Sequence, residues 1–387
     1  MDADQAVPVN HSNIKSFEFS GKAREYFSIW IVNICLTILT LGIYSAWAKV
    51  RTNQYFYGNT RLDDVSFRYL ASPITILKGR LIAFGAFVIY YLATMVSPVV
   101  AGIIMLLLML LLPALLVLSM SFRLRNSAYR NVKFDFDKNF KQAYKVFALP
   151  VLIIGAYVFM INMFMPKPSA DPGVQPEFPV LIAIFPLLIM FLFPWWEFMV
   201  TQFKVLHAKF GEAAMQFNAR TGDYYKMYLF AFFVFMLAGI LFAVVMGSMG
   251  AFFSDGLKQD EAASMIAQTV TMVMVLMFVP LYLWFFAYIQ TRRTNLLYNN
   301  IEIENHRLQS DLRTKYMMYL YFTNTLAMVL SLGLLTPWAK IRTARYRASR
   351  TSLMVDGDLN EFSAAQQRKQ SALGEEMGDM FDLDLGF

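Results

Sequence analysis

A single acidic side chain, Glu197, lies inside one of the long apolar stretches of this chain, within the aromatic run 193–198. Inserting an ionised carboxylate into a bilayer costs about 2.5 to 3.5 kcal/mol, so such a residue is a candidate to bind a proton, a cation or a substrate. Lys204 follows about 10 Å further along a helix, which also allows Glu197 to face the polar interface. We favour interfacial packing, with an intramembrane polar site as the alternative.

Two asparagines in apolar stretches, Asn33 and Asn324, occupy equivalent positions in an internal repeat with an offset of 291 residues. The same offset superimposes the runs 43–52 and 334–343. A buried amide needs a hydrogen-bond partner, and such bonds between membrane helices contribute about 0.6 kcal/mol on average. We therefore favour a role in holding the two copies together, with the polar lining of a shared cavity as the alternative.

Each copy of the repeat also carries a tryptophan followed by two basic residues. These are Trp47, Lys49 and Arg51 in the first copy, and Trp338, Lys340 and Arg342 in the second. Indole rings settle at the headgroup level of a bilayer, and long cationic side chains reach the lipid phosphates. We favour an interfacial anchor over the alternative, a basic pocket for an anionic lipid headgroup.

No catalytic or metal-binding pattern accompanies these residues. The histidines, His11, His207 and His306, lack the spacing of metal ligands, and Cys35 is the only cysteine. The chain has neither a Gly-x-x-x-x-Gly-Lys loop for ATP nor a Gly-x-Ser-x-Gly nucleophile motif. We expect a protein that is not an enzyme and that has no cofactor or metal.

The composition is that of a membrane protein. Hydrophobic residues make up 57% of the chain, charged residues 16%, and the mean hydropathy is +0.45. The formal net charge of +7 indicates basic cytoplasmic loops and contact with membrane lipids, not with nucleic acid.

Six apolar stretches are long enough to cross a bilayer, which takes about 20 residues of helix. They lie at about 79–97, 99–120, 145–166, 179–203, 227–251 and 264–289. Basic residues concentrate in the segments 49–80, 121–145, 204–226 and 290–315. These segments, and with them both termini, are therefore expected in the cytoplasm.

Two further apolar stretches, about 27–47 and 317–338, belong to the two copies of the repeat. Basic residues flank both, so a straight crossing would carry positive charge and both termini across the membrane. Gly42 and Gly333 interrupt the stretches and favour a hinge or break. We predict two re-entrant or interfacial elements in addition to six spans, with eight plain spans as the alternative.

Short alternating segments flank the apolar stretches and divide the chain into five strand-and-hairpin units. The units cover about 17–60, 67–131, 134–211, 217–300 and 306–351. We expect an all-α membrane domain over 17–351, whose short strands pair into one small cytoplasmic β-sheet because isolated ribbons are marginal. A polar N-terminal tail, 1–16, and an acidic, largely disordered tail, 352–387, flank this domain.

The run 41–51, the aromatic exit 55–57 and the opening run 17–21 resemble the signature of the YjgN family of bacterial inner-membrane proteins. The resemblance covers about residues 14–360, and the repeated Trp-Ala-Lys element makes it fairly specific. One departure is Ala46, where the family often has proline; Pro337 keeps it in the second copy. The resemblance implies a multi-pass protein of the bacterial inner membrane and, because the family is of unknown function, no activity.

Two functions of different classes fit these features. The first is a passive or secondary transporter, a channel or a lipid-binding protein, with its site near Glu197 and the interrupted stretches, because transporters often bind substrates where repeats meet and helices break. The second is a membrane assembly or regulatory module. It would bind a partner protein, such as a membrane protease, through the cytoplasmic sheet or the C-terminal tail.

Overall fold

The structure is a computed structural model that describes residues 14–164, 180–256 and 261–382. In this part of the chain, short strands alternate with pairs of helices. The strands are β1 (Ile14–Phe19), β2 (Thr60–Leu62), β3 (Val65–Ser66), β4 (Arg68–Tyr69), β5 (Ser127–Tyr129), β6 (Val132–Phe136), β7 (Ala208–Phe210), β8 (Ala213–Phe217), β9 (Ile301–Ile303), β10 (His306–Ser310) and β11 (Thr351–Met354). The helices are α1 (Ala23–Leu39), α2 (Ser45–Gly58), α3 (Pro73–Val96), α4 (Pro98–Arg125), α5 (Phe140–Phe164), α6 (Val180–Leu206), α7 (Thr221–Gly256), α8 (Glu261–Tyr298), α9 (Thr314–Leu330), α10 (Thr336–Ser349) and α11 (Leu359–Asp382).

The strands of the described residues join one antiparallel sheet in the order β3-β2-β1-β11-β10-β9-β8-β7-β6-β5-β4. Strands β3 and β4, at the two ends of this order, follow each other in the chain with Phe67 between them, so the sheet closes into a barrel-like ring. Strands β1 and β11, from opposite ends of the chain, pair as Ile14↔Met354 and Ser16↔Ser352. The ring is larger than the small sheet that the sequence predicts, so the fold combines helices with a β-ring and is not all-α.

Tight turns join neighbouring strands because their central residues adopt left-handed backbone conformations. Asp63 and Asp64 have φ angles of 50° and 59°, and Arg130 and Asn131 have 49° and 66°. Two successive positive φ angles form the turn whose twist matches that of the flanking strands. The turns therefore fix β2–β3 and β5–β6 as hairpins of the ring.

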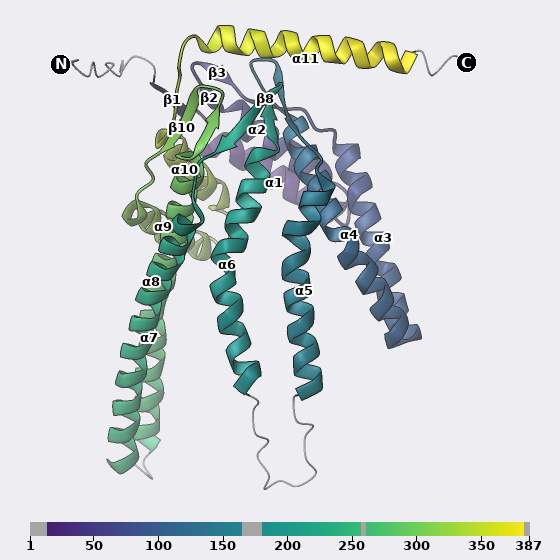
Figure 1. Cartoon of the computed structure of the whole chain (residues 1–387). Helices are drawn as coiled ribbons and strands as arrows, with labels where there is room; N and C mark the ends of the chain where they lie inside the picture. Colours follow the sequence, from purple (N-terminus) through teal and green to yellow (C-terminus); the bar gives the residue numbers. More distant parts are fainter. Residues whose placement is uncertain (1–13, 165–179, 257–260, 383–387) are drawn as a thin grey trace, which may run out of the picture.

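Long helices extend from the ring in pairs (Figure 1). Five candidate membrane spans lie in the described residues: Pro73–Val96, Pro98–Arg125, Phe140–Ile161, Ile184–Leu206 and Thr221–Ser248. The sixth stretch expected to span, 264–289, lies within α8, and many side chains of its first half fall outside the described ones. Between 6 and 22% of each candidate span is buried within the chain, so most of its apolar surface faces the surroundings, as lipid contact requires.

The two copies of the repeat form short helical hairpins, α1–α2 and α9–α10, that begin and end at the ring. The chain reverses direction at 40–44 and 331–335, where Gly42 and Gly333 have φ angles of 93° and 87°. Glycine adopts this region without the steric clash that a side chain creates. Leu41 and Leu332, beside the glycines, are each 94% exposed and form apolar tips. Both stretches therefore fold back instead of running straight, in contrast to the geometry of plain spans.

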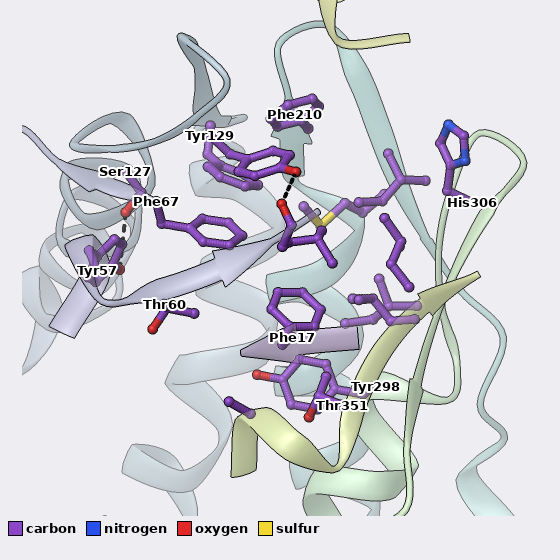
Figure 2. A pocket seen from close by; sticks show the side chains of 18 of the residues that line it. Phe17, Tyr57, Thr60, Phe67, Ser127, Tyr129, Phe210, Tyr298, His306 and Thr351 are labelled. Carbon is purple, nitrogen blue, oxygen red and sulfur yellow. Dashed lines mark hydrogen bonds between the residues drawn. The ribbon is translucent and has the colours of Figure 1, made fainter. Parts of the chain in front are cut away.

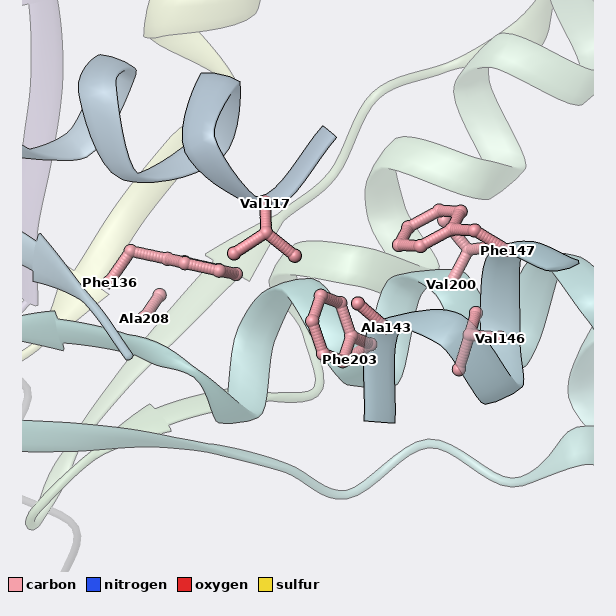
Figure 3. Packing of buried hydrophobic residues seen from close by; sticks show 8 residues of the cluster. All are labelled: Val117, Phe136, Ala143, Val146, Phe147, Val200, Phe203 and Ala208. Carbon is pink, nitrogen blue, oxygen red and sulfur yellow. The ribbon is translucent and has the colours of Figure 1, made fainter. Parts of the chain in front are cut away.

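Buried apolar side chains join the helices to the ring. Figure 3 shows one cluster, in which Val117 of α4, Phe147 of α5 and Phe203 of α6 pack with Phe136 of β6. The ring of Phe203 lies 5.9 Å from that of Phe136 and 5.7 Å from that of Phe147, in edge-to-face contacts. The packed core thus lies where helices meet strands.

The C-terminal segment differs from the largely disordered tail that its acidic composition predicts. Helix α11 lies across the ring (Figure 1). Leu359, Ser363 and Gln366 are buried, and their spacing of three and four residues places them on one face of the helix. Composition averaged over the tail conceals this stripe, because charged residues occupy the other faces.

Candidate functional site

The ring encloses a largely apolar cavity of about 700 Å³ (Figure 2). Three sets of residues line it, and each set has one member per unit. Segments that enter a helical hairpin contribute Phe17, Phe67, Phe134, Met215 and Leu308. Strands that leave a hairpin contribute Leu62, Tyr129, Phe210, Ile303 and Leu353 and, two residues earlier, Thr60, Ser127, Ala208, Ile301 and Thr351. Residues two apart share the inner face because side chains alternate along a strand.

Cross-strand pairing brings the first two sets together into an apolar belt. Phe17 pairs with Leu62, and the ring of Phe67 stacks on that of Tyr129 with centroids 4.7 Å apart. Directly opposite side chains on an antiparallel pair lie in contact and stabilise the sheet. The belt therefore shapes the cavity and holds the strands together.

Four hydroxyl groups in the lining donate hydrogen bonds within the protein. Thr60, Ser127 and Thr351 donate to main-chain carbonyl oxygens four residues earlier, at 2.8, 2.9 and 2.9 Å. Tyr129 donates to the carbonyl oxygen of Leu62 at 2.7 Å, and burial raises the pKa of Tyr129. These hydroxyls are not free for a polar ligand, so the wall suits an apolar one.

The two rims of the ring differ. Helices leave from one of them, which we call the helix rim, and there Tyr57, Tyr298 and Arg347 line the cavity. Tight turns form the other, the turn rim, where Leu359 and Phe362 of α11 line the cavity. The cavity thus runs from the ends of the helices to the underside of α11.

Hydrogen bonds from two glutamines hold α11 on the turn rim. Gln366 accepts from the main-chain N–H of Glu212 at 3.0 Å and donates to the carboxylate of Glu304 at 2.9 Å. Gln370, one helical turn later, accepts from the main-chain N–H of Lys133 at 3.1 Å and donates to its carbonyl oxygen at 3.3 Å. These contacts join three neighbouring strand hairpins, so α11 covers part of this rim.

Glu197 is buried in α6 and each of its carboxylate oxygens has a partner. Nε of Arg293 lies 2.6 Å from Oε1, and the hydroxyl of Tyr228 donates to Oε2. The carboxylate therefore links α6 to α7 and α8. Pairing of this kind offsets the cost of burying the charge.

The two asparagines do not pair with each other. Asn324 is buried and bonded inside its own hairpin, where Nδ2 donates to Oγ1 of Thr343 at 3.1 Å and Oδ1 accepts from Arg342 at 3.4 Å. Asn33 is equally buried, but its side-chain amide has no hydrogen bond to a described residue. The link between the copies that we favour from the sequence is therefore absent from the described residues.

The two tryptophan motifs have different surroundings. The guanidinium of Arg342 lies 5.0 Å from the ring centroid of Tyr319 and 5.1 Å from that of Trp338. In the first copy, Arg51 instead donates to the hydroxyl of Tyr44 at 3.0 Å. The remaining members of the motifs are Trp47, which is half-buried, and Lys49 and Lys340, which are exposed.

Sequence reasoning missed the ring cavity and most of its lining. A signal was present, since the offset of 291 residues superimposes Thr60 on Thr351 and Leu62 on Leu353. The pattern of two inward residues per strand was too short in any one unit to reveal a closed ring.

Comparison with known proteins gives a family and a location for its relatives. The family described as "Bacterial protein of unknown function (DUF898)" matches residues 15–380. A relative named "Inner membrane protein YjgN" from Salmonella typhimurium is 27% identical over 379 residues, 93% of this chain and 92% of the relative. Its namesake from Escherichia coli K12 is 25% identical over 378 residues, 93% of each chain.

No solved structure matches this chain significantly. The resemblance to YjgN proteins that the repeated Trp-Ala-Lys element indicates is confirmed, over nearly the whole chain. This chain belongs to the DUF898 family of bacterial proteins of unknown function.

Proposed function

We propose that this protein is a multi-pass protein of the bacterial inner membrane that binds the apolar chain of a lipid-like molecule in the ring cavity. The observation that carries the proposal is the largely apolar cavity of about 700 Å³, whose helix rim faces the apolar helices. Cavities of roughly 300 to 1,000 Å³ accommodate small ligands. The name of the relatives supports the membrane location. The proposal assigns binding and no catalysis.

The proposed topology has six spans, two re-entrant hairpins, and the ring and both termini in the cytoplasm. Basic residues near the ring support this orientation, since cytoplasmic segments carry the excess of Lys and Arg. The exposed leucines at the tips of α1–α2 and α9–α10 support insertion of these hairpins into the inner leaflet. Their length suits a dip into the bilayer and not a crossing.

Lipid chains reach the helix rim between the helical hairpins. Since at most 22% of any candidate span is buried, lipid surrounds the spans. Moving an acyl chain from the bilayer into the cavity exchanges one apolar environment for another, so the hydrophobic effect contributes little. Selectivity then depends on van der Waals fit to the belt of side chains.

Filling the cavity tests the proposal. Ala208 is buried on the inner face of β7, whereas Ala214 on β8 pairs with the outward Lys209 and is exposed. Ala208→Trp is expected to remove most cross-linking of a photoreactive fatty acid in isolated membranes. Ala214→Trp is the matched control and is expected to label like the unchanged protein.

Equal cross-linking in Ala208→Trp and Ala214→Trp, with both proteins unfolding at the temperature of the unchanged protein, would contradict the proposal. Ile301→Trp, which fills the cavity from a different unit, provides a second test if Ala208→Trp does not fold. Mass spectrometry of lipids that copurify with each variant is an independent measurement.

Helix α11 bears on the second hypothesis, a module that binds a partner protein through the C-terminal tail. The face of α11 that carries Leu359, Ser363 and Gln366, and that would serve as a docking surface, is buried against the ring. This favours α11 as a lid of the cavity over α11 as a docking peptide. Binding of a partner protein is a separate proposal, and it requires release of the helix.

A further inference from the structure

A second hollow lies at the seam between the first and last helical hairpins. Its volume is about 440 Å³, and Tyr316, Trp338, Arg342, Arg345 and Tyr346 form most of its wall. The start of α1 completes it. None of these residues lines the ring cavity, so the hollow is a separate place on the molecule.

Positive charge in this hollow is not compensated by acidic side chains. Within the described residues, no carboxylate oxygen forms an ion pair within 4.0 Å of Arg342 or Arg345. Arg345 donates to the neutral carbonyl oxygen of Gly21 at 3.1 Å. Helix α10 adds Lys340 and Arg347 and contains no acidic residue. The hollow therefore attracts anions.

The guanidinium of Arg342 is held in a defined orientation. It lies over the aromatic rings of Tyr319 and Trp338, and it donates to Oγ1 of Thr323 and to Oδ1 of the buried Asn324. A planar guanidinium that is already stacked and bonded loses little freedom when it binds a further anion. Asn324 thus acts as a positioning residue for Arg342.

The first copy of the repeat lacks this chemistry. At the offset of 291 residues, Gln54 stands in place of Arg345 and Glu25 in place of Tyr316. The carboxylate of Glu25 accepts a hydrogen bond from the hydroxyl of Tyr55 at 3.2 Å. An acidic group at this position repels an anion, so the two hairpins share a fold but differ in what they attract.

The position of the hollow identifies the source of the anion. Trp338 is 37% exposed and lies on α10 between the apolar tip at Leu332 and the ring. Exposed indoles settle at the level of lipid headgroups, and the tip directs the hairpin toward the hydrocarbon. Lipid phosphates lie at this depth.

We propose that this hollow binds the phosphate group of an anionic phospholipid. Arg342 and Arg345 contact the phosphate oxygens, since guanidinium groups match phosphate geometry with paired hydrogen bonds. Trp338 and Tyr316 pack against the glycerol and the first methylenes of the lipid. The proposal rests on the proposed topology, which places Trp338 at headgroup depth, and is independent of ligand binding in the ring cavity.

Thermal unfolding of the purified full-length protein in a neutral detergent tests the proposal. The unfolding temperature is titrated with short-chain phosphatidylglycerol, short-chain phosphatidylcholine and inorganic phosphate. Phosphatidylglycerol is expected to raise the unfolding temperature at concentrations roughly tenfold below those at which phosphatidylcholine or inorganic phosphate does so. Arg345→Gln introduces the residue that the first copy has at the equivalent position, Gln54. It is expected to raise the half-saturating concentration of phosphatidylglycerol about tenfold or more, as the loss of a charge-assisted hydrogen bond predicts.

Arg61→Gln, at an exposed arginine of β2 that lies outside the hollow, is the control and is expected to leave the titration unchanged. Equal titrations for Arg345→Gln and the unchanged protein would overturn the proposal, as would equal effects of phosphatidylglycerol and phosphatidylcholine. Saturation by inorganic phosphate at the concentration of phosphatidylglycerol would overturn the assignment to a lipid. Within the described residues Arg345 forms one hydrogen bond, to the carbonyl oxygen of Gly21. The unfolding temperature without lipid shows whether Arg345→Gln folds like the unchanged protein.

Discussion

Asp63 joins three parts of the ring through one carboxylate. Nζ of Lys15 on β1 lies 2.7 Å from Oδ1, and the guanidinium of Arg130, in the β5–β6 turn, bonds Oδ2. The hydrogen bond from Lys15 holds the pKa of Asp63 below its usual value and raises the pKa of Lys15. The contact therefore stabilises the ring only while Asp63 is ionised and Lys15 is protonated.

Asp63→Asn is expected to lower the free energy of unfolding by about 1 to 3 kcal/mol at neutral pH, because Arg130 and Lys15 lose their ionic partner. The folded pKa of Asp63 is lowered, so its contribution is complete above the unfolded value, about pH 4, and is lost as the pH falls through the folded value. Equilibrium unfolding in detergent at a series of pH values measures the difference.

Asp64→Asn is the control for Asp63→Asn, because Asp64 is exposed and has the same left-handed backbone. It is expected to change stability little at any pH. A loss of unfolding free energy in Asp63→Asn that persists undiminished in acid would contradict the stabilising role of the Asp63 carboxylate. An equal loss in Asp64→Asn would contradict it as well.

Glu197 shows how far sequence reasoning reaches at this scale. A lone acid in an apolar stretch is recognisable from residue type, whereas its partners depend on how α6, α7 and α8 pack. Tyr228 and Arg293 lie on different helices far along the chain, and no local pattern connects them. The difference in charge between the first and last hairpins is likewise present in the sequence, where Glu25 and Gln54 replace Tyr316 and Arg345. The sequence alone does not show that these positions lie beside the same hollow.

Among the elements, those with local signals were predictable and those with distant partners were not. Alternating segments predict strands, and apolar stretches interrupted by Gly42 and Gly333 predict hairpins that fold back. The pairing of β1 with β11 joins residues near opposite ends of the chain, and its closure of the ring has no local signal. Helix α11 was missed because its contacts are made with turns of other units.

Gln366→Ala is expected to loosen α11, since it leaves the main-chain N–H of Glu212 without its acceptor, at a cost of about 1 to 3 kcal/mol. Faster hydrogen exchange in the main chain of residues 359–372 measures this effect. Gln367→Ala is the matched control, because Gln367 is the same residue type one position later and is exposed. Equal exchange in the two variants would show that Gln366 does not hold the lid.

At the scale of the whole molecule, the units meet chiefly at the ring and at the clusters beside it. The candidate spans are little buried, and helices of neighbouring units also pack against one another, as α8 does with α9 and α4 with α5. Apolar composition predicts the spans but carries no information about such an arrangement.

Single cysteines in a Cys35→Ser background test the proposed topology. Glu212→Cys, on the turn rim, is expected to react with a membrane-impermeant thiol reagent in inverted vesicles and not in intact cells. Leu41→Cys and Leu332→Cys, at the two tips, are expected to react from neither side, because the proposed topology places both tips in hydrocarbon. Labelling at 212 in intact cells would reverse the orientation, and labelling at either tip from the periplasm would show that the hairpins cross.

The pairing of β1 with β11 has a consequence for synthesis. Before residues 351–354 are synthesised, β1 and β10 of the nascent chain lack their shared partner and are free edges. The preceding helices are already available for insertion at that stage. Free strand edges pair readily with other chains. Premature termination before β11 is therefore expected to yield membrane-inserted fragments that aggregate through their free strand edges. Pairing of β11 with β1 and β10 removes these two edges.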